Sequence, residues 1–171
     1  MIHKEVPIRG FKLTGLFHMR IVRNGKTLKD HVVKNDIVNV GLDYLLDQMF
    51  VSLASASGWY IGLINDTSFT SLSNADTMSS HAGWLELTDY NEETRPAWVP
   101  SSIGSQAIIN STQATFTMNA TKTVKGILIA NNATRGGTAG TLWSTALLGQ
   151  TIAVEAADIV LVNYKLTASR G

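Results

Sequence analysis

The carboxylates that stand closest together in this sequence are Asp89, Glu92 and Glu93, with Arg95 beside them. Paired carboxylates hydrolyse glycosidic bonds when they are held across a substrate cleft at a defined separation. These three instead belong to residues 88–105, a stretch rich in turn-forming residues. We therefore expect a solvated loop here and assign no catalytic residue to it.

The other reactive side chains lack partners at useful spacing. His18 and His31 could face each other across two strands, but a metal site would need a further ligand, and His81 has none at ligand spacing. No serine stands in a G-x-S-x-G sequence, and no histidine follows His81. The glycine-rich residues 135–140 open no helix and lack the lysine of a phosphate-binding loop. We expect no metal, no cofactor and no enzymatic activity.

Composition narrows the class of protein further. The chain has 171 residues and no cysteine, so disulfides and thiolate chemistry are excluded. No run approaches the roughly 20 apolar residues of a membrane span, and the first ten residues lack the apolar core of a signal peptide. We expect a single domain large enough to bury its own core, with no membrane association and no export by the usual secretory route.

Charge is unevenly distributed along the chain although the formal net charge is only +1. Residues 1–35 hold eight Lys or Arg and two acidic residues, whereas residues 36–171 hold six Lys or Arg and eleven acidic residues. A basic first section on an acidic body could bind an acidic neighbour, including another copy of the chain. The alternative is a solvated hairpin whose lysines protect an edge strand from aggregation.

The second half of the chain has the pattern of successive β-strands. Ala114, Phe116 and Met118 alternate with polar residues, which is typical of a half-buried strand. The segment VKGILIA at 124–130 is almost continuously apolar and is expected to be covered on both faces. Segments of this kind stand at 114–119, 124–130, 142–148, 150–155 and 158–167. Their short spacing favours antiparallel pairing.

The first half adds an arm, a hairpin and one helix. Residues 1–11 are expected to form an N-terminal arm, and the Asn24–Gly25 pair between apolar alternations predicts a β-hairpin over residues 12–34. From Val38 the apolar period becomes helical, so an amphipathic helix is predicted to plug an open end of the sandwich. Its apolar face comprises Val38, Leu42, Leu45, Leu46, Met49 and Phe50.

Together these elements predict an all-β fold: an antiparallel, jelly-roll-like β-sandwich with one short helix, in which residues 12–171 form a single domain. Several segments, in this order, also carry a resemblance to a known group of proteins. They are NVGLDYLLD at 39–47, WYIGL at 59–63, TRPAW at 94–98, TVKGILI at 123–129 and TLWS at 141–144. The order resembles virion structural proteins of tailed bacteriophages, in particular the small β-sandwich proteins that decorate or cement the capsid.

The resemblance implies a cement or decoration protein that stabilises the capsid shell and has no catalytic residues. Its partners would be the major capsid protein and further copies of itself, as a dimer or trimer. It would be located on the capsid surface of the virion after assembly in the bacterial host cytoplasm. Nucleic acid is not an expected partner, because aromatic residues are not interleaved with the basic ones.

Eight side chains are candidates for these protein contacts. Those expected to meet an acidic capsid surface are Arg9 on the arm and Arg20, Arg23, Lys26 and Lys29 on the hairpin. Those expected to contact a neighbouring copy are Tyr90, Arg95 and Trp98 on the loop. Trp98 lies between two prolines and can alternatively form a lid over the core, the interpretation that its setting favours.

Two other classes of function remain open. The first is a component of the phage tail, baseplate or connector, since such proteins share similar β modules. The second is a carbohydrate-binding module, which would need Trp98, Trp84 or Tyr90 coplanar on an exposed face.

Overall fold

The computed structural model describes residues 10–50 and 58–170, so most of the predicted arm, Arg9 included, lies outside the described residues. The elements follow in this order: β1 (Phe11–Arg23), β2 (Lys26–Lys34), β3 (Asp36–Ile37), α1 (Asn39–Phe50), β4 (Trp59–Asn65), β5 (Leu85–Leu87), β6 (Ala97–Trp98), β7 (Pro100–Gly104), β8 (Ala107–Asn110), β9 (Ala114–Thr117), β10 (Lys122–Ala130), β11 (Leu142–Val154) and β12 (Ile159–Arg170).

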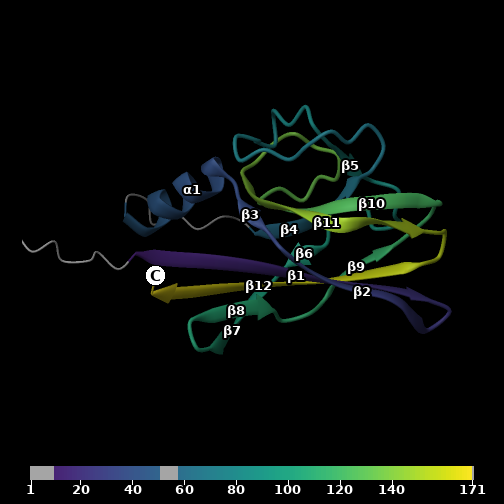
Figure 1. Cartoon of the computed structure of the whole chain (residues 1–171), viewed down its shortest axis with the longest axis horizontal. Helices are drawn as coiled ribbons and strands as arrows, with labels where there is room; N and C mark the ends of the chain where they lie inside the picture. Colours follow the sequence, from purple (N-terminus) through teal and green to yellow (C-terminus); the bar gives the residue numbers. More distant parts are fainter. Residues whose placement is uncertain (1–9, 51–57, 171) are drawn as a thin grey trace, which may run out of the picture.

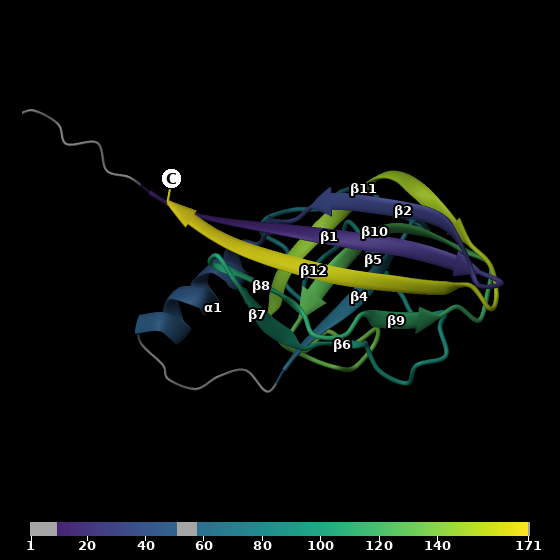
Figure 2. The ribbon, with the colours of Figure 1, turned by 90° about the horizontal axis from the view of Figure 1, so that it is seen from below.

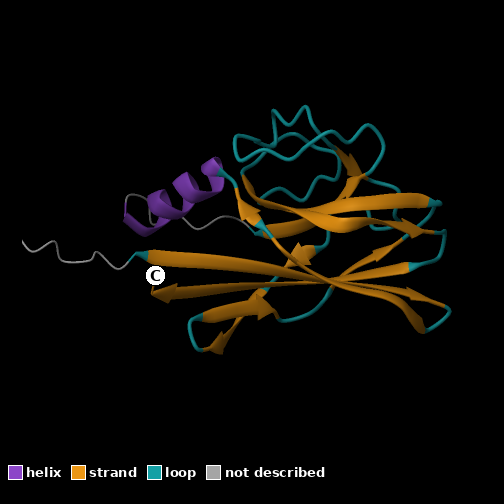
Figure 3. Ribbon diagram, in the orientation of Figure 1, coloured by secondary structure: helices purple, strands orange, loops and turns teal. Residues whose placement is uncertain are grey.

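Two six-stranded antiparallel sheets pack against each other (Figures 1 and 3). The first sheet has the order β2-β1-β12-β8-β7, and β9 also pairs with β12. The second has the order β3-β11-β10-β4-β5, and β6 also pairs with β4. The predicted class, an antiparallel β-sandwich with one short helix, is confirmed.

The main core lies between the two sheets and follows from period-two alternation. On β1, Phe17, Met19 and Ile21 are buried because alternate side chains of a strand point to the same face. Val162 and Tyr164 on β12 complete this layer from the neighbouring strand. β1 and β12 pair along their whole length, so the first and last strands lie side by side (Figure 2).

The β1–β2 hairpin forms as the sequence predicts. Asn24 and Gly25 both have positive φ, +50° and +74°, which is the conformation that a two-residue hairpin turn requires. The turn projects at the end of the molecule opposite to α1 (Figures 1 and 2).

β10 is covered on both faces, as the apolar run at 124–130 predicts. Ile127 and Ile129 point into the main core, whereas Leu128 and Ala130 join a second cluster with Trp84. Met78 and Trp84, at the end of a long loop, cover this second cluster from outside the sandwich. The second sheet is therefore buried on both sides over its central strands.

Two boundaries differ from the prediction. The segments predicted at 142–148 and 150–155 form one continuous strand, β11. The irregular stretch expected at 88–105 contains β6 and β7. Pro100 is tolerated at the start of β7 because this strand lies at the edge of its sheet, where the missing N–H breaks no ladder.

The helix α1 stands over one end of the sandwich, as predicted, but does not fill it. Its start packs closely on β11, since a Cβ on Gly41 would lie 2.4 Å from the backbone oxygen of Trp143. Farther along, Tyr44 stacks edge-on against Trp59. Leu42 and Leu46 remain largely exposed on the other side of the helix.

Candidate functional site

Arg95 and Glu86 form a buried ion pair at the loop where carboxylates cluster in the sequence. The Arg95 side chain is 0% exposed, and its Nε and Nη2 donate to the two carboxylate oxygens of Glu86 over 2.8 and 2.7 Å. The guanidinium also donates to the backbone oxygens of Asn132 and Gly137, and the Gly136 N–H donates to Glu86. Because these polar atoms are paired, the arrangement fixes two loops together.

The neighbouring carboxylates are also held in structural contacts. Glu92 accepts hydrogen bonds from the backbone N–H of Thr117, and Asp89 lies 3.2 Å from the Nζ of Lys122. Arg135 stacks over the ring of Tyr90 and donates to its backbone oxygen. Burial raises the pKa of the Tyr90 phenol well above its ordinary value, so this group stays neutral.

The three loop side chains predicted to contact a neighbouring copy are therefore not exposed at the surface. Tyr90 and Arg95 are fully buried, and Trp98 is only 6% exposed, with its Nε1 donating to the backbone oxygen of Tyr164. Trp98 forms the lid that its position between two prolines favours. The carbohydrate-binding alternative loses its stacking platform, because Trp84 is buried as well.

The histidines of the hairpin do not face each other. Across β1 and β2, His18 lies opposite Val32, and His31 lies opposite Met19. His18 instead contacts the carboxylate of Asp30, which also accepts from Arg20. Hydrogen bonding from His18, followed by Arg20, lowers the pKa of Asp30. Within residues 10–50 and 58–170, no three His, Asp or Glu side chains are grouped so that they could hold a metal ion.

Arg23 is not available as a free cation at the hairpin. Its Nε and Nη2 donate to the two carboxylate oxygens of Asp158 over 2.6 and 2.7 Å, and its Nη1 lies 2.9 Å from Glu155. The hydrogen bonds from Arg23 lower the pKa of Asp158, which is almost fully buried. Arg23 therefore ties β1 to the β11–β12 turn, and its expected capsid contact stays a prediction.

The first sheet of the sandwich is basic, whereas the rest of the described chain is acidic. The strands of the first sheet contain eight Lys or Arg and a single acidic residue, Asp30. The remaining described residues contain four Lys or Arg and eleven Asp or Glu. Within the described part of the chain, seven Lys or Arg form no ion pair; one of them, Arg135, instead donates to the backbone oxygens of Tyr90 and Glu92. The other six all lie in the first sheet: Lys12, Lys26, Lys29, Lys34, Lys165 and Arg170.

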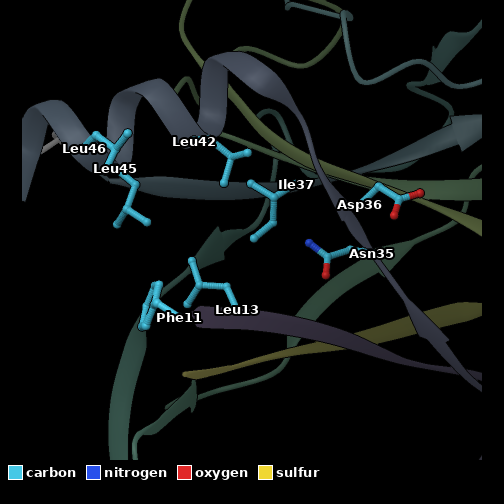
Figure 4. A pocket seen from close by; sticks show the side chains of 8 residues that line it. All are labelled: Phe11, Leu13, Asn35, Asp36, Ile37, Leu42, Leu45 and Leu46. Atoms are coloured by element: carbon cyan, nitrogen blue, oxygen red, sulfur yellow. The ribbon is translucent and has the colours of Figure 1, made fainter. Parts of the chain in front are cut away.

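An open apolar groove lies between α1 and the start of β1, with a volume of about 680 Å³. Figure 4 shows Leu42 and Leu45 of the helix facing Phe11 and Leu13 on β1. Phe11 is 67% exposed, so its ring is available to a partner. We call this the α1 groove and define it by Phe11, Leu13, Asn35, Asp36, Ile37, Leu42, Leu45 and Leu46.

A buried polar network supports one wall of the α1 groove. The Asn35 amide donates to the hydroxyl oxygen of Tyr164 over 3.1 Å, and Trp143 Nε1 donates to the same oxygen over 3.0 Å. Both Asn35 and Tyr164 press on Gly15, where an added Cβ would lie 2.1 and 2.4 Å from them. Glycine at position 15 is what allows the network to form.

Sequence reasoning missed the α1 groove. The available signal was that Phe11 and Leu13 continue the odd-numbered apolar alternation of β1 beyond the core residues. A second signal was the apolar face of the helix, which includes Leu42, Leu45 and Leu46. This face is wider than the part of a helix that packs against a single sandwich. Neither signal predicts that the start of β1 and the helix α1 remain apart and leave an open groove between them.

No protein-family model matches this chain, and no curated protein matches it in sequence. None of the helices that the structure describes is both long and apolar enough to cross a membrane.

Proposed function

We propose that this chain is a structural protein of a tailed-bacteriophage virion that binds the capsid shell and stabilises it. Its order of packing motifs, which resembles decoration and cement proteins, supports the proposal. A second support is that Asp89, Glu92 and Arg95, which cluster on the loop in the sequence, form contacts that hold the loop in place. Binding to the assembled shell and not to free subunits would stabilise the shell by mass action.

The observation that carries this proposal is that six of the seven Lys and Arg side chains without an ion pair among the described residues lie in the first sheet. Lys34 on β2 and Lys165 on β12 both lie opposite Leu16 on β1, so the three form one row across the sheet. This row is on the outer face, because the neighbouring positions Gly15 and Phe17 are buried on the opposite face of the strand. A basic face with an apolar centre is complementary to an acidic protein surface.

The predicted contacts of the hairpin are refined by this geometry. Arg20 lies on the same outer face but shares Asp30 with His18, so it contributes less net charge than a free lysine. Lys12 also lies on the outer face by its register with Ser169. In this proposal Lys12, Lys34 and Lys165 supply the main attraction to the capsid.

Co-sedimentation of the purified chain with emptied capsids of the same phage tests the proposal. The variant K34S/K165S should bind capsids at least about tenfold more weakly, and binding of the natural chain should fall as salt is raised, because exposed charges are screened. The matched control is K122S/K125S, which removes two cations of the second sheet that pair with Asp89 and Asp66.

The control should keep the affinity of the natural chain. Equal binding by the two variants would contradict the electrostatic proposal. A chain that sediments with tails but never with emptied heads would instead support the tail or baseplate alternative.

A further inference from the structure

Three of the six acidic residues that form no ion pair within the described residues stand at the α1 groove. Asp36 lines the groove, and Asp43 and Asp47 stand one helical position beyond the Leu42–Leu46 stripe. Residues four apart lie on the same face of a helix, so the two aspartates form a row along α1 beside the leucines that line the groove. All three aspartates are exposed. The groove therefore has an apolar floor and an acidic rim.

The tip of the β1–β2 hairpin has the complementary character. Its first strand residues on β2, Lys26 to Asp30, are all exposed. Leu28 is 47% exposed and stands between Lys26 and Lys29, neither of which forms an ion pair within the described residues. An apolar side chain between two free cations is what an apolar groove with an acidic rim would bind.

The groove and the tip of one molecule cannot meet, because they lie at opposite ends of the sandwich (Figures 1 and 2). Two grooves brought together would place Asp43 and Asp47 of both copies against one another, and two tips would do the same with their lysines. Both contacts are repulsive. Groove against tip is the arrangement of two identical copies in which these charges attract.

We infer that the α1 groove of one copy binds the β1–β2 hairpin tip of a second copy. Leu28 enters between Leu46 and Phe11, while Lys26 and Lys29 meet the acidic rim. Since the two surfaces differ, the contact is head-to-tail, and a pair of copies keeps one free groove at one end and one free tip at the other. Such a contact closes into a ring or continues as a filament.

This contact uses residues other than the outer-face lysines of the proposed capsid contact. It is measured on the purified chain without capsids, so its failure and the failure of the proposed function are distinguishable. The experiment is sedimentation velocity of the full chain over a range of concentrations, at low salt and at high salt. The natural chain should associate with increasing concentration and dissociate as salt is raised.

Charge reversal then identifies the surfaces. The tip variant K26E/K29E and the groove variant D43K/D47K should each lose association by at least about tenfold in dissociation constant. An equimolar mixture of the two should regain it, because the reversed groove meets the reversed tip and the natural groove meets the natural tip. The control E93K changes an exposed carboxylate away from both surfaces and should associate like the natural chain.

Unchanged circular dichroism and thermal unfolding of each variant would show that the fold is retained. A natural chain that stays monomeric at low salt and high concentration would overturn the inference. It would also be overturned if either reversed variant kept its association, or if the mixture of the two failed to restore it.

Discussion

The loop at residues 88–98 and the α1 end of the sandwich both place charge beside apolar side chains, with opposite results. In the loop, Arg95 is buried and the polar atoms of its pair with Glu86 are matched. At the α1 end, Asp43 and Asp47 are exposed without an ion pair among the described residues, beside an exposed Leu46. Charge that is buried and paired fixes the fold, whereas exposed charge without a partner beside apolar surface is available for binding. The predictions below separate these two uses.

Removing Arg95 should have the largest effect on stability. R95A leaves the carboxylate of Glu86 buried without its counter-charge, which should lower the free energy of unfolding by about 3 to 5 kcal/mol. Urea unfolding followed by tryptophan fluorescence measures it. The double variant E86L/R95M removes both charges and should lose less than R95A. A loss below about 1 kcal/mol for R95A would contradict the structural role of the pair.

The second-largest effect on stability should come from adding one methyl group beneath the α1 groove. In G15A the new Cβ would collide with Asn35 and Tyr164, which should destabilise the fold by about 1 to 3 kcal/mol. The matched control is G149A on β11, where a Cβ meets nothing within 4 Å. That control should be neutral or stabilising by up to about 1 kcal/mol, because alanine loses less backbone entropy on folding. Equal effects of the two substitutions would contradict the network described around Tyr164.

The ion pair between Arg23 and Asp158 should give stability a dependence on pH. The pKa of Asp158 is lowered by folding, so its contribution is complete above the unfolded value of about 3.9 and is lost as the pH falls through the lower folded-state pKa. Unfolding free energies of the natural chain and D158N, measured from pH 7 to pH 2, should therefore converge at the acidic end.

The exposed pair of His18 and Asp30 provides the comparison for this pH series. The pKa of Asp30 is lowered in the same direction, but water screens its partners, so D30N should change the pH profile less than D158N. A larger effect of D30N would mean that the buried pair is not the dominant one.

An exposed leucine of the α1 groove should have the smallest effect on stability. L46A should change the free energy of unfolding by no more than about 0.5 kcal/mol, because Leu46 is 56% exposed. L63A, at a fully buried position, should lose about 2 to 5 kcal/mol. Self-association measured by sedimentation should be weakened by L46A. A strongly destabilised L46A would show that α1 depends on this side chain for its packing and would remove Leu46 from the binding surface.

The elements that depend on local sequence could be predicted, and those that depend on distant partners could not. Asn24–Gly25 specifies its turn, and the apolar run at 124–130 specifies a strand buried on both faces, from neighbouring residues alone. The burial of Arg95 depends on carbonyl groups 37 and 42 residues away, and the pairing of Arg23 depends on a carboxylate 135 residues away. Sequence spacing contains no signal for such contacts.

The candidate binding surfaces show the same division. Lys26 and Lys29 on the predicted hairpin are expected to meet an acidic partner, and the structure shows that both are exposed. The α1 groove was missed because Phe11 and Leu42 come from separate elements, and their separation depends on how α1 is seated on β11. An apolar residue at an expected core position therefore does not show by itself whether the core closes over it.

Electron cryomicroscopy of the purified virion tests the central claim most directly. The account predicts density for this sandwich on the capsid shell, with the face that carries Lys34 and Lys165 turned toward an acidic surface of the capsid protein. Virions whose shell carries no such density, with the chain found only in the tail or not at all, would contradict it.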